Sequence, residues 1–119
     1  MKILLVDDDE ILRSTMKMFM EQLLPSSVKI YQASDGLSAI DAYQNNYFDL
    51  IISDVDMPKM NGFDFYEKIK DQKKHNFFYF LTGFLANKDK FQEVKKYYKP
   101  IDVMELVEDI KRDLCITND

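Results

Sequence analysis

The chain has 119 residues and a mass of 14.1 kDa, so residues 1–119 are expected to form one domain with a substantial apolar core. A formal net charge of −5 argues against direct binding to nucleic acid, and no apolar run reaches the length of about 20 residues that membrane insertion requires. Cys115 is the only cysteine, which leaves no disulfide framework and predicts a reducing, cytoplasmic location.

Short apolar runs alternate with amphipathic runs along the chain. They predict, in order, strand 2–6, helix 10–24, strand 28–32, helix 37–43, strand 48–52, helix 63–73, strand 77–81, helix 88–96, strand 97–98 and helix 102–115. This alternation predicts an α/β fold, with an open five-stranded parallel sheet and helices on both faces. His75 falls in a lysine-rich turn between two predicted elements and is expected to be solvated.

Polar side chains follow four of the predicted strands. Ligands of open parallel sheets bind beyond the carboxyl ends of the strands, so these side chains are expected to meet at one edge. They are Asp7, Asp8 and Asp9 after the first strand, Asp54 and Asp56 after the third, Thr82 after the fourth and Lys99 after the fifth.

Such a group of acids needs a compensating partner. Two carboxylates about 4 Å apart repel by roughly 4 kcal/mol at an effective dielectric constant near 20. Mg²⁺ prefers oxygen ligands and typically binds one or two carboxylates together with phosphate and water. With a lysine and a hydroxyl nearby, the residues predict a phosphoryl-transfer site with an aspartate as acceptor.

Four short motifs then carry a resemblance to a known family. They are VDDD at 6–9, SDVDMPKMNG at 53–62, LTG at 81–83 and KP at 99–100. With these motifs in this order, the chain from Lys2 to about Leu114 resembles the receiver domains of two-component response regulators, in particular single-domain, chemotaxis-regulator-like ones. The resemblance implies the flavodoxin-like strand order 2-1-3-4-5.

The resemblance also implies a role for each acid. Asp54 would be the phosphoacceptor. Asp8, Asp54 and the backbone carbonyl of Asp56 would hold Mg²⁺, and Asp7 would support the ion through water. Asp9 occupies a tolerant position, where an acid that favours the start of a helix is sufficient explanation.

Further roles concern the phosphoryl group and its donor. Thr82 and Lys99 would bind the phosphoryl oxygens, and the bond between Lys99 and Pro100 would be cis. The donor would be a phosphohistidine on a histidine kinase or a histidine phosphotransfer protein. The domain would catalyse only its own phosphorylation and dephosphorylation, so it is not expected to be an enzyme acting on other molecules. Its output would be a contact with a downstream protein.

The chain departs from the family pattern after Thr82. Lys96 stands where the family has an aromatic residue that rotates inward on activation. The connection 83–95 is close to the minimum of about 10 to 12 residues for a crossover, which predicts a shortened fourth helix of about two turns. A monomer or weak dimer is therefore expected. Phe84, two residues after Thr82, predicts slow self-dephosphorylation because it would hinder the attacking water, unless it turns away into helix packing.

Two other functions remain open. The chain could be a degenerate receiver that acts as a binding module independent of phosphorylation. Asp54-Val55-Asp56 also resembles the nucleophile signature of haloacid-dehalogenase-type phosphatases, but there the acid pair follows the nucleophile, whereas here it precedes it. The sequence is compatible both with a complete single-domain regulator and with a receiver from a longer chain.

Overall fold

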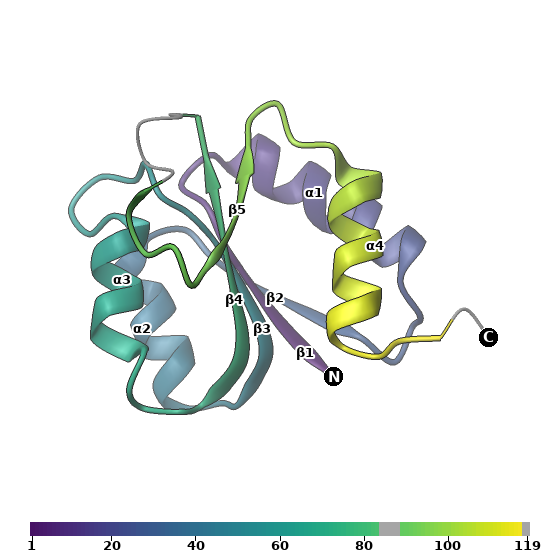
Figure 1. Cartoon of the computed structure of the whole chain (residues 1–119), viewed down its shortest axis with the longest axis horizontal. Coiled ribbons are helices and arrows are strands. Elements are labelled where there is room, and N and C mark those ends of the chain that lie inside the picture. The colour runs from purple at the N-terminus through teal and green to yellow at the C-terminus, as the bar shows by residue number, and fades with distance from the viewer. Residues whose placement is uncertain (84–88, 118–119) are drawn as a thin grey trace.

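The computed structural model describes residues 1–83 and 89–117. Its five strands form one parallel sheet in the order β2-β1-β3-β4-β5, which confirms the predicted fold (Figure 1). The elements are β1 (Lys2–Val6), α1 (Glu10–Leu23), β2 (Lys29–Ala33), α2 (Gly36–Gln44), β3 (Phe48–Asp54), α3 (Gly62–Ile69), β4 (His75–Thr82), β5 (Lys95–Tyr98) and α4 (Val103–Asp113). None of the described helices is both long and apolar enough to cross a membrane.

The sheet separates two apolar cores. One core lies under α2 and α3 and includes Tyr43, Phe65 and Phe80. The other lies under α1 and α4 and includes Met20 and Leu106. Because the central strands β1 and β3 face both cores, most of their residues are buried, which explains why their sequences read as continuous apolar runs. Figure 1 shows the two helical layers on opposite sides of the sheet.

The predicted helix over 88–96 is wrong for the residues that the structure describes. Asp89 has a 3₁₀ conformation, residues 90–93 form turns, Val94 lies in a bend, and Lys95–Tyr98 form strand β5. Phe91 has a φ angle of 51°, a left-handed conformation that interrupts an α-helix. Over residues 89–96, the described part of the predicted helix, the chain therefore forms no α-helix.

His75 also differs from its predicted environment. It is the first residue of β4, two positions before the predicted start of that strand, and it is partly buried. Its Nδ1 atom lies 2.8 Å from the hydroxyl of buried Tyr43, and that hydroxyl accepts a hydrogen bond from the backbone N–H of Lys74. The lysine-rich run before His75 suggested solvent exposure, but the strand begins early enough to pack the imidazole against α2.

Candidate functional site

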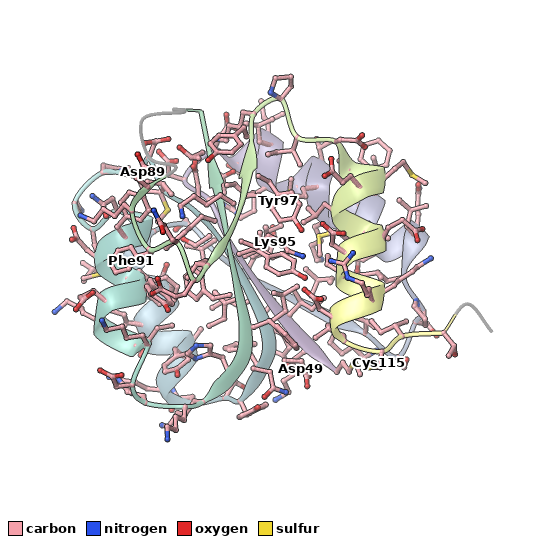
Figure 2. All side chains as sticks on the ribbon, in the orientation of Figure 1. Asp49, Asp89, Phe91, Lys95, Tyr97 and Cys115 are labelled. Atoms are coloured by element: carbon pink, nitrogen blue, oxygen red, sulfur yellow. The ribbon has the colours of Figure 1, made fainter. Side chains whose placement is uncertain are left out.

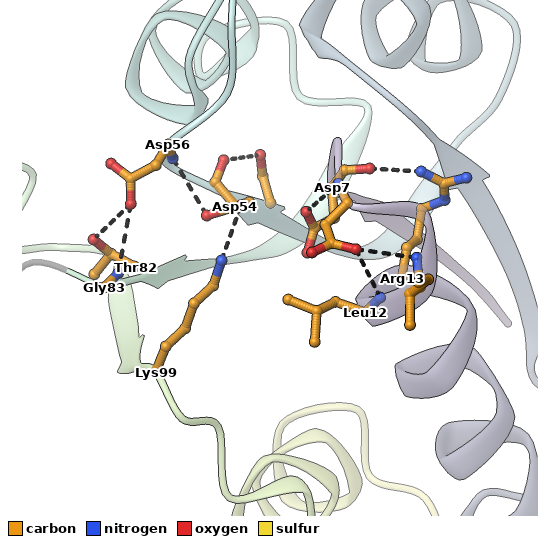
Figure 3. Close-up of polar contacts among 11 residues, drawn as sticks. Asp7, Leu12, Arg13, Asp54, Asp56, Thr82, Gly83 and Lys99 are labelled. Carbon is orange, nitrogen blue, oxygen red and sulfur yellow. Dashed lines mark hydrogen bonds and ion pairs between the residues drawn. The ribbon is translucent and has the colours of Figure 1, made fainter.

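The carboxyl ends of β1, β3, β4 and β5 bring the predicted site residues together (Figure 3). Asp54 is the last residue of β3 and is 2% exposed, and Asp7 directly follows β1 and is 4% exposed. Thr82 ends β4 and is fully buried, whereas Lys99 directly follows β5 and is partly exposed. The site therefore has buried acids and a lysine that solvent reaches.

Lys99 is bonded to the predicted acceptor. Its Nζ atom lies 3.0 Å from Asp54 Oδ2, and its backbone N–H donates to the carbonyl oxygen of Thr82 at 2.8 Å. Burial alone would lower the pKa of Lys99, but the hydrogen bond and the charges of Asp54 and Asp7 raise it. The ammonium group therefore stays charged near neutral pH. The bond from Lys99 to Pro100 is cis, as predicted.

Three carboxylates gather beside this lysine. Asp7, Asp8 and Asp54 each place an oxygen within 4.8 Å of the others. Burial raises the pKa of Asp7 to about 6; the N–H of Asp9 lowers it and the charge of Asp54 raises it. The pKa of Asp54 is also raised by burial, although the hydrogen bond and charge of Lys99 oppose this.

These residues fit a divalent cation. Lys99 supplies one positive charge against three carboxylates, two of which are buried, so the cluster keeps a net negative charge. A hard cation with oxygen ligands, such as Mg²⁺, would complete the compensation. The carboxylates of Asp7, Asp8 and Asp54 are the ligands that the structure brings together, and the backbone carbonyl of Asp56 remains a predicted ligand.

Asp9 and Arg13 have structural roles next to the cluster. The carboxylate of Asp9 caps α1 by accepting hydrogen bonds from the N–H groups of Ile11 and Leu12, both at 3.1 Å. Arg13 Nη1 donates to the carbonyl oxygen of Asp7 at 2.7 Å and so ties α1 to the end of β1. Sequence reasoning missed Arg13. Its position one turn into the helix, on the same face as the cap, was the signal that could have indicated it.

The loop after β3 places Asp56 between the acceptor and β4. The N–H of Asp56 donates to Asp54 Oδ1 at 3.3 Å, and Asp56 Oδ2 accepts from the hydroxyl of Thr82 at 3.4 Å and from the N–H of Gly83 at 3.5 Å. The loop closes at Gly62, where an added Cβ would lie 2.3 Å from the carbonyl oxygen of Asp54. The motif therefore needs glycine at 62, because the chain passes directly over the acceptor strand.

An apolar cavity of about 570 Å³ borders the site on its α1 side, and sequence reasoning missed it. Its apolar lining comes from α1, from β4 and from the chain between β5 and the start of α4, and comprises Leu12, Met16, Phe19, Leu81, Pro100, Ile101 and Val103. Leu12 and Phe19 are 48% and 39% exposed. Because Asp7 and Lys99 also line the cavity, a partner that fills it would touch the acceptor site.

The predictions for Lys96 and Phe84, both after Thr82 in the chain, have different outcomes. Lys96 occupies β5, and its Nζ atom donates to the carbonyl oxygen of Phe91 at 2.9 Å. The position where the family has an aromatic side chain is therefore occupied by a lysine that is hydrogen-bonded to Phe91. Phe84 lies outside the described residues, so its effect on hydrolysis remains a prediction.

Comparison with known proteins agrees with this geometry. The profile of the response regulator receiver domain matches residues 3–111. Over 69 residues the chain is 42% identical to the autoinducer 1 sensor kinase/phosphatase LuxN of Vibrio campbellii, a match that covers 58% of this chain and 8% of LuxN.

Solved structures match almost the whole chain. The chemotaxis response regulator CheY4 of Vibrio cholerae is 28% identical with a TM-score of 0.80, and the match covers 94% of this chain and 97% of that one. The response regulator TrrA of Thermotoga maritima, in complex with Mg²⁺ and BeF, is 25% identical with a TM-score of 0.81 and the same two coverages. The match over residues 3–111, together with the acids, threonine and lysine at the predicted strand ends, shows that this chain belongs to the response regulator receiver domain family.

Proposed function

We propose that Asp54 accepts a phosphoryl group from a phosphohistidine on a histidine kinase or a histidine phosphotransfer protein. The acceptor role is general in receiver domains, and the contact of 3.0 Å between Lys99 Nζ and Asp54 Oδ2 is the observation that carries it to this chain. Asp54 is buried at the end of β3, yet the cavity beside Asp7 and Lys99 gives a partner access to the site.

The residues of the site have separate roles in the transfer. A carboxylate oxygen of Asp54 forms a bond to phosphorus, while the bond from phosphorus to the imidazole nitrogen breaks and leaves its electron pair on that nitrogen. Lys99 and Thr82 bind phosphoryl oxygens, by charge and by a hydrogen bond. Thr82 can do so only if its hydroxyl leaves Asp56 Oδ2, to which it donates at 3.4 Å.

Mg²⁺ is the cofactor that the acids fit. Asp7, Asp8 and Asp54, with the backbone carbonyl of Asp56, would hold it. When bound, the ion neutralises the charge of the acids and of the phosphoryl oxygens that approach them. Without it, the incoming phosphoryl group would meet three carboxylates and one ammonium group, and this net repulsion would prevent transfer.

The apolar cavity beside α1 supports a docking role for this face. A helix of the kinase or phosphotransfer protein that places an apolar side chain between Leu12 and Phe19 would bring its histidine toward Lys99 and Asp54. The lining of the cavity by both α1 and the chain after β5 favours this direction of approach.

The remaining parts of the proposal concern output and location. The domain catalyses its own phosphorylation and dephosphorylation only, works in the cytoplasm and signals through contacts with a downstream protein. The match of the receiver domain profile to residues 3–111 supports the signalling role, and the single cysteine, Cys115, supports a reducing compartment.

Mass spectrometry of the intact protein tests the proposal. After treatment with a small acyl phosphate donor and Mg²⁺, the mass should increase by one phosphoryl group, and EDTA or Asp54→Asn should abolish the increase. Asp49→Asn is the matched control, because it removes an acid from the opposite end of the same strand and keeps an acceptor for the N–H of Lys2. Labelling of Asp54→Asn would contradict the assignment. An unlabelled wild-type protein would favour the phosphorylation-independent binding module, and continuous release of phosphate from many donors would favour the phosphatase.

A further inference from the structure

The segment 89–94 lies over the sheet face in place of the described part of the predicted helix, and several contacts hold it there. We call it the strap. Lys96 Nζ donates to the carbonyl oxygen of Phe91 at 2.9 Å, and the hydroxyl of Tyr66 in α3 donates to Glu93 Oε2 at 3.2 Å. The N–H of Val94 donates to the carbonyl oxygen of Phe91 at 3.0 Å, and the Val94 side chain is buried.

Phe91 is the apolar anchor of the strap. Its ring centroid lies 5.0 Å from that of Tyr66, 5.6 Å from that of Phe63 and 6.2 Å from that of Phe80. Figure 2 shows Phe91 beside α3, on the side of the sheet away from Tyr97 and α4. A bulky residue rarely adopts a φ angle of 51°, so the packing of this ring and the bond from Lys96 hold the strap in an unfavourable backbone conformation.

The rings under Phe91 belong to the same chain segments as the acceptor site. Phe63 follows Gly62, the residue that closes the acceptor loop over Asp54. Phe80 lies two residues before Thr82 on β4, so both side chains share one face of the sheet. A movement of Thr82 toward a phosphoryl group would therefore disturb the same layer of rings that Phe91 anchors.

The residue at the family's switch position cannot act in the usual way here. The stem of Lys96 crosses the layer beside Phe80, with Nζ 5.9 Å from the ring centroid, and its ammonium group is engaged by the strap. Tyr97, the next residue, is buried on the opposite face, where its hydroxyl donates to Asp109. Neither side chain is placed to rotate into space vacated by Thr82.

We propose that the strap, anchored by Phe91 and clasped by Lys96, is the element that changes conformation when Asp54 is phosphorylated, in place of a rotating aromatic residue in β5. The inference rests on the proposed function, because it assigns a response to phosphorylation of that site. Its physical basis is the contiguous path from Asp54 and Thr82 through Phe63 and Phe80 to Phe91. The response is release of the strap, since its backbone conformation depends on a few contacts.

Hydrogen exchange of strap peptides, with and without Mg²⁺ and beryllofluoride, tests the inference. In the wild-type protein, the activated state should exchange at least about fivefold faster over 89–94. In Lys96→Met, which keeps most of the stem but loses the bond to Phe91, exchange should be fast in both states. Lys90→Met is the matched control and should behave like wild type. Lys90 Nζ lies over the rings of Phe63 and Phe91, at 5.3 and 5.7 Å from their centroids, whereas the bond to the carbonyl oxygen of Phe91 comes from Lys96.

Fluorine NMR of the same samples separates the two proposals. A resonance of bound beryllofluoride that disappears in Asp54→Asn shows that the acceptor site is formed. Strap exchange that stays unchanged while this resonance is present overturns the inference and leaves the proposed function standing. Loss of the resonance in the wild-type protein overturns both. Fast exchange in Lys90→Met equal to that of Lys96→Met would show that any lost lysine loosens the strap, and would also overturn the assigned role of Lys96.

Discussion

The metal-free protein should become more stable when Asp7 loses its charge. Asp7 is buried beside two other carboxylates, and its pKa is raised from the usual 3.8 to about 6. One pH unit between these values corresponds to about 1.4 kcal/mol, so ionised Asp7 lowers the free energy of unfolding by about 3 kcal/mol above pH 6. Asp7→Asn should recover up to this amount near neutral pH, because an asparagine oxygen can still accept from the N–H of Asp9.

The direction of the pH dependence follows from the sign of the pKa change. An acid whose pKa is raised by folding stabilises the folded state fully below pH 3.8, and this stability is lost as pH rises to about 6. The wild-type protein should therefore lose stability relative to Asp7→Asn across this range. Above it the difference should stay constant.

Urea unfolding in EDTA, followed by circular dichroism, measures these differences. Asp41→Asn is the control, since it removes the same charge from an exposed position on α2. Added Mg²⁺ should stabilise the wild-type protein more than Asp7→Asn by mass action. If Asp7→Asn unfolds at the same or a lower urea concentration than the wild type near neutral pH, burial and repulsion do not dominate at this position.

Four other predictions concern the partner face, the histidine, the oligomeric state and hydrolysis. Phe19→Asp should slow phosphotransfer from a histidine kinase about tenfold without changing labelling by a small donor. Met18 is exposed on α1 outside the cavity, so Met18→Asp should change neither the phosphotransfer nor the labelling. If Phe19→Asp slows the phosphotransfer and the labelling alike, the docking proposal is contradicted. Burial lowers the pKa of His75, so its NMR titration midpoint should lie below 6.5. The stability that neutral His75 contributes above pH 6.5 should be lost as pH falls through that midpoint. A midpoint above 6.5 would refute the buried environment. Lys95 is paired with Asp109 and Asp113 of its own chain, so sedimentation of the beryllofluoride-loaded protein should show a monomer or weak dimer; a tight dimer broken by Lys95→Glu would contradict this. Phe84→Ala should accelerate loss of the phosphoryl group more than about twofold, and a smaller change would remove the steric explanation.

The strands and the acceptor site were predictable because both depend on short-range patterns. Buried parallel strands give continuous apolar runs, and the polar residue that ends such a run must lie at one edge of the sheet. These two rules are sufficient to place Asp7, Asp54, Thr82 and Lys99 at one edge of the sheet. They need only the order of elements, which the alternation of patterns supplies.

The strap and the cavity were not predictable because they depend on packing between distant segments. The left-handed φ angle of Phe91 arises from rings on α3 and β4 and from an ammonium group on β5, none of which its local sequence indicates. The spacing of residues 88–96 permits a helix and so predicts one, although few of these residues are apolar. His75 was misplaced for a similar reason, since the lysines before it hid the start of β4 and the contact with Tyr43.

The two glycines next to the site should differ sharply in a survey of random variants. At Gly62 any side chain would collide with the backbone of Asp54, so every substitution would shift the acceptor itself. At Gly83 an added Cβ would meet nothing within 4 Å among the described residues, and the φ angle is not positive. A selection for signalling should therefore retain glycine at 62 and accept alanine or serine at 83. Both motifs, 53–62 and 81–83, end in glycine, but only the glycine of the first is required by its surroundings.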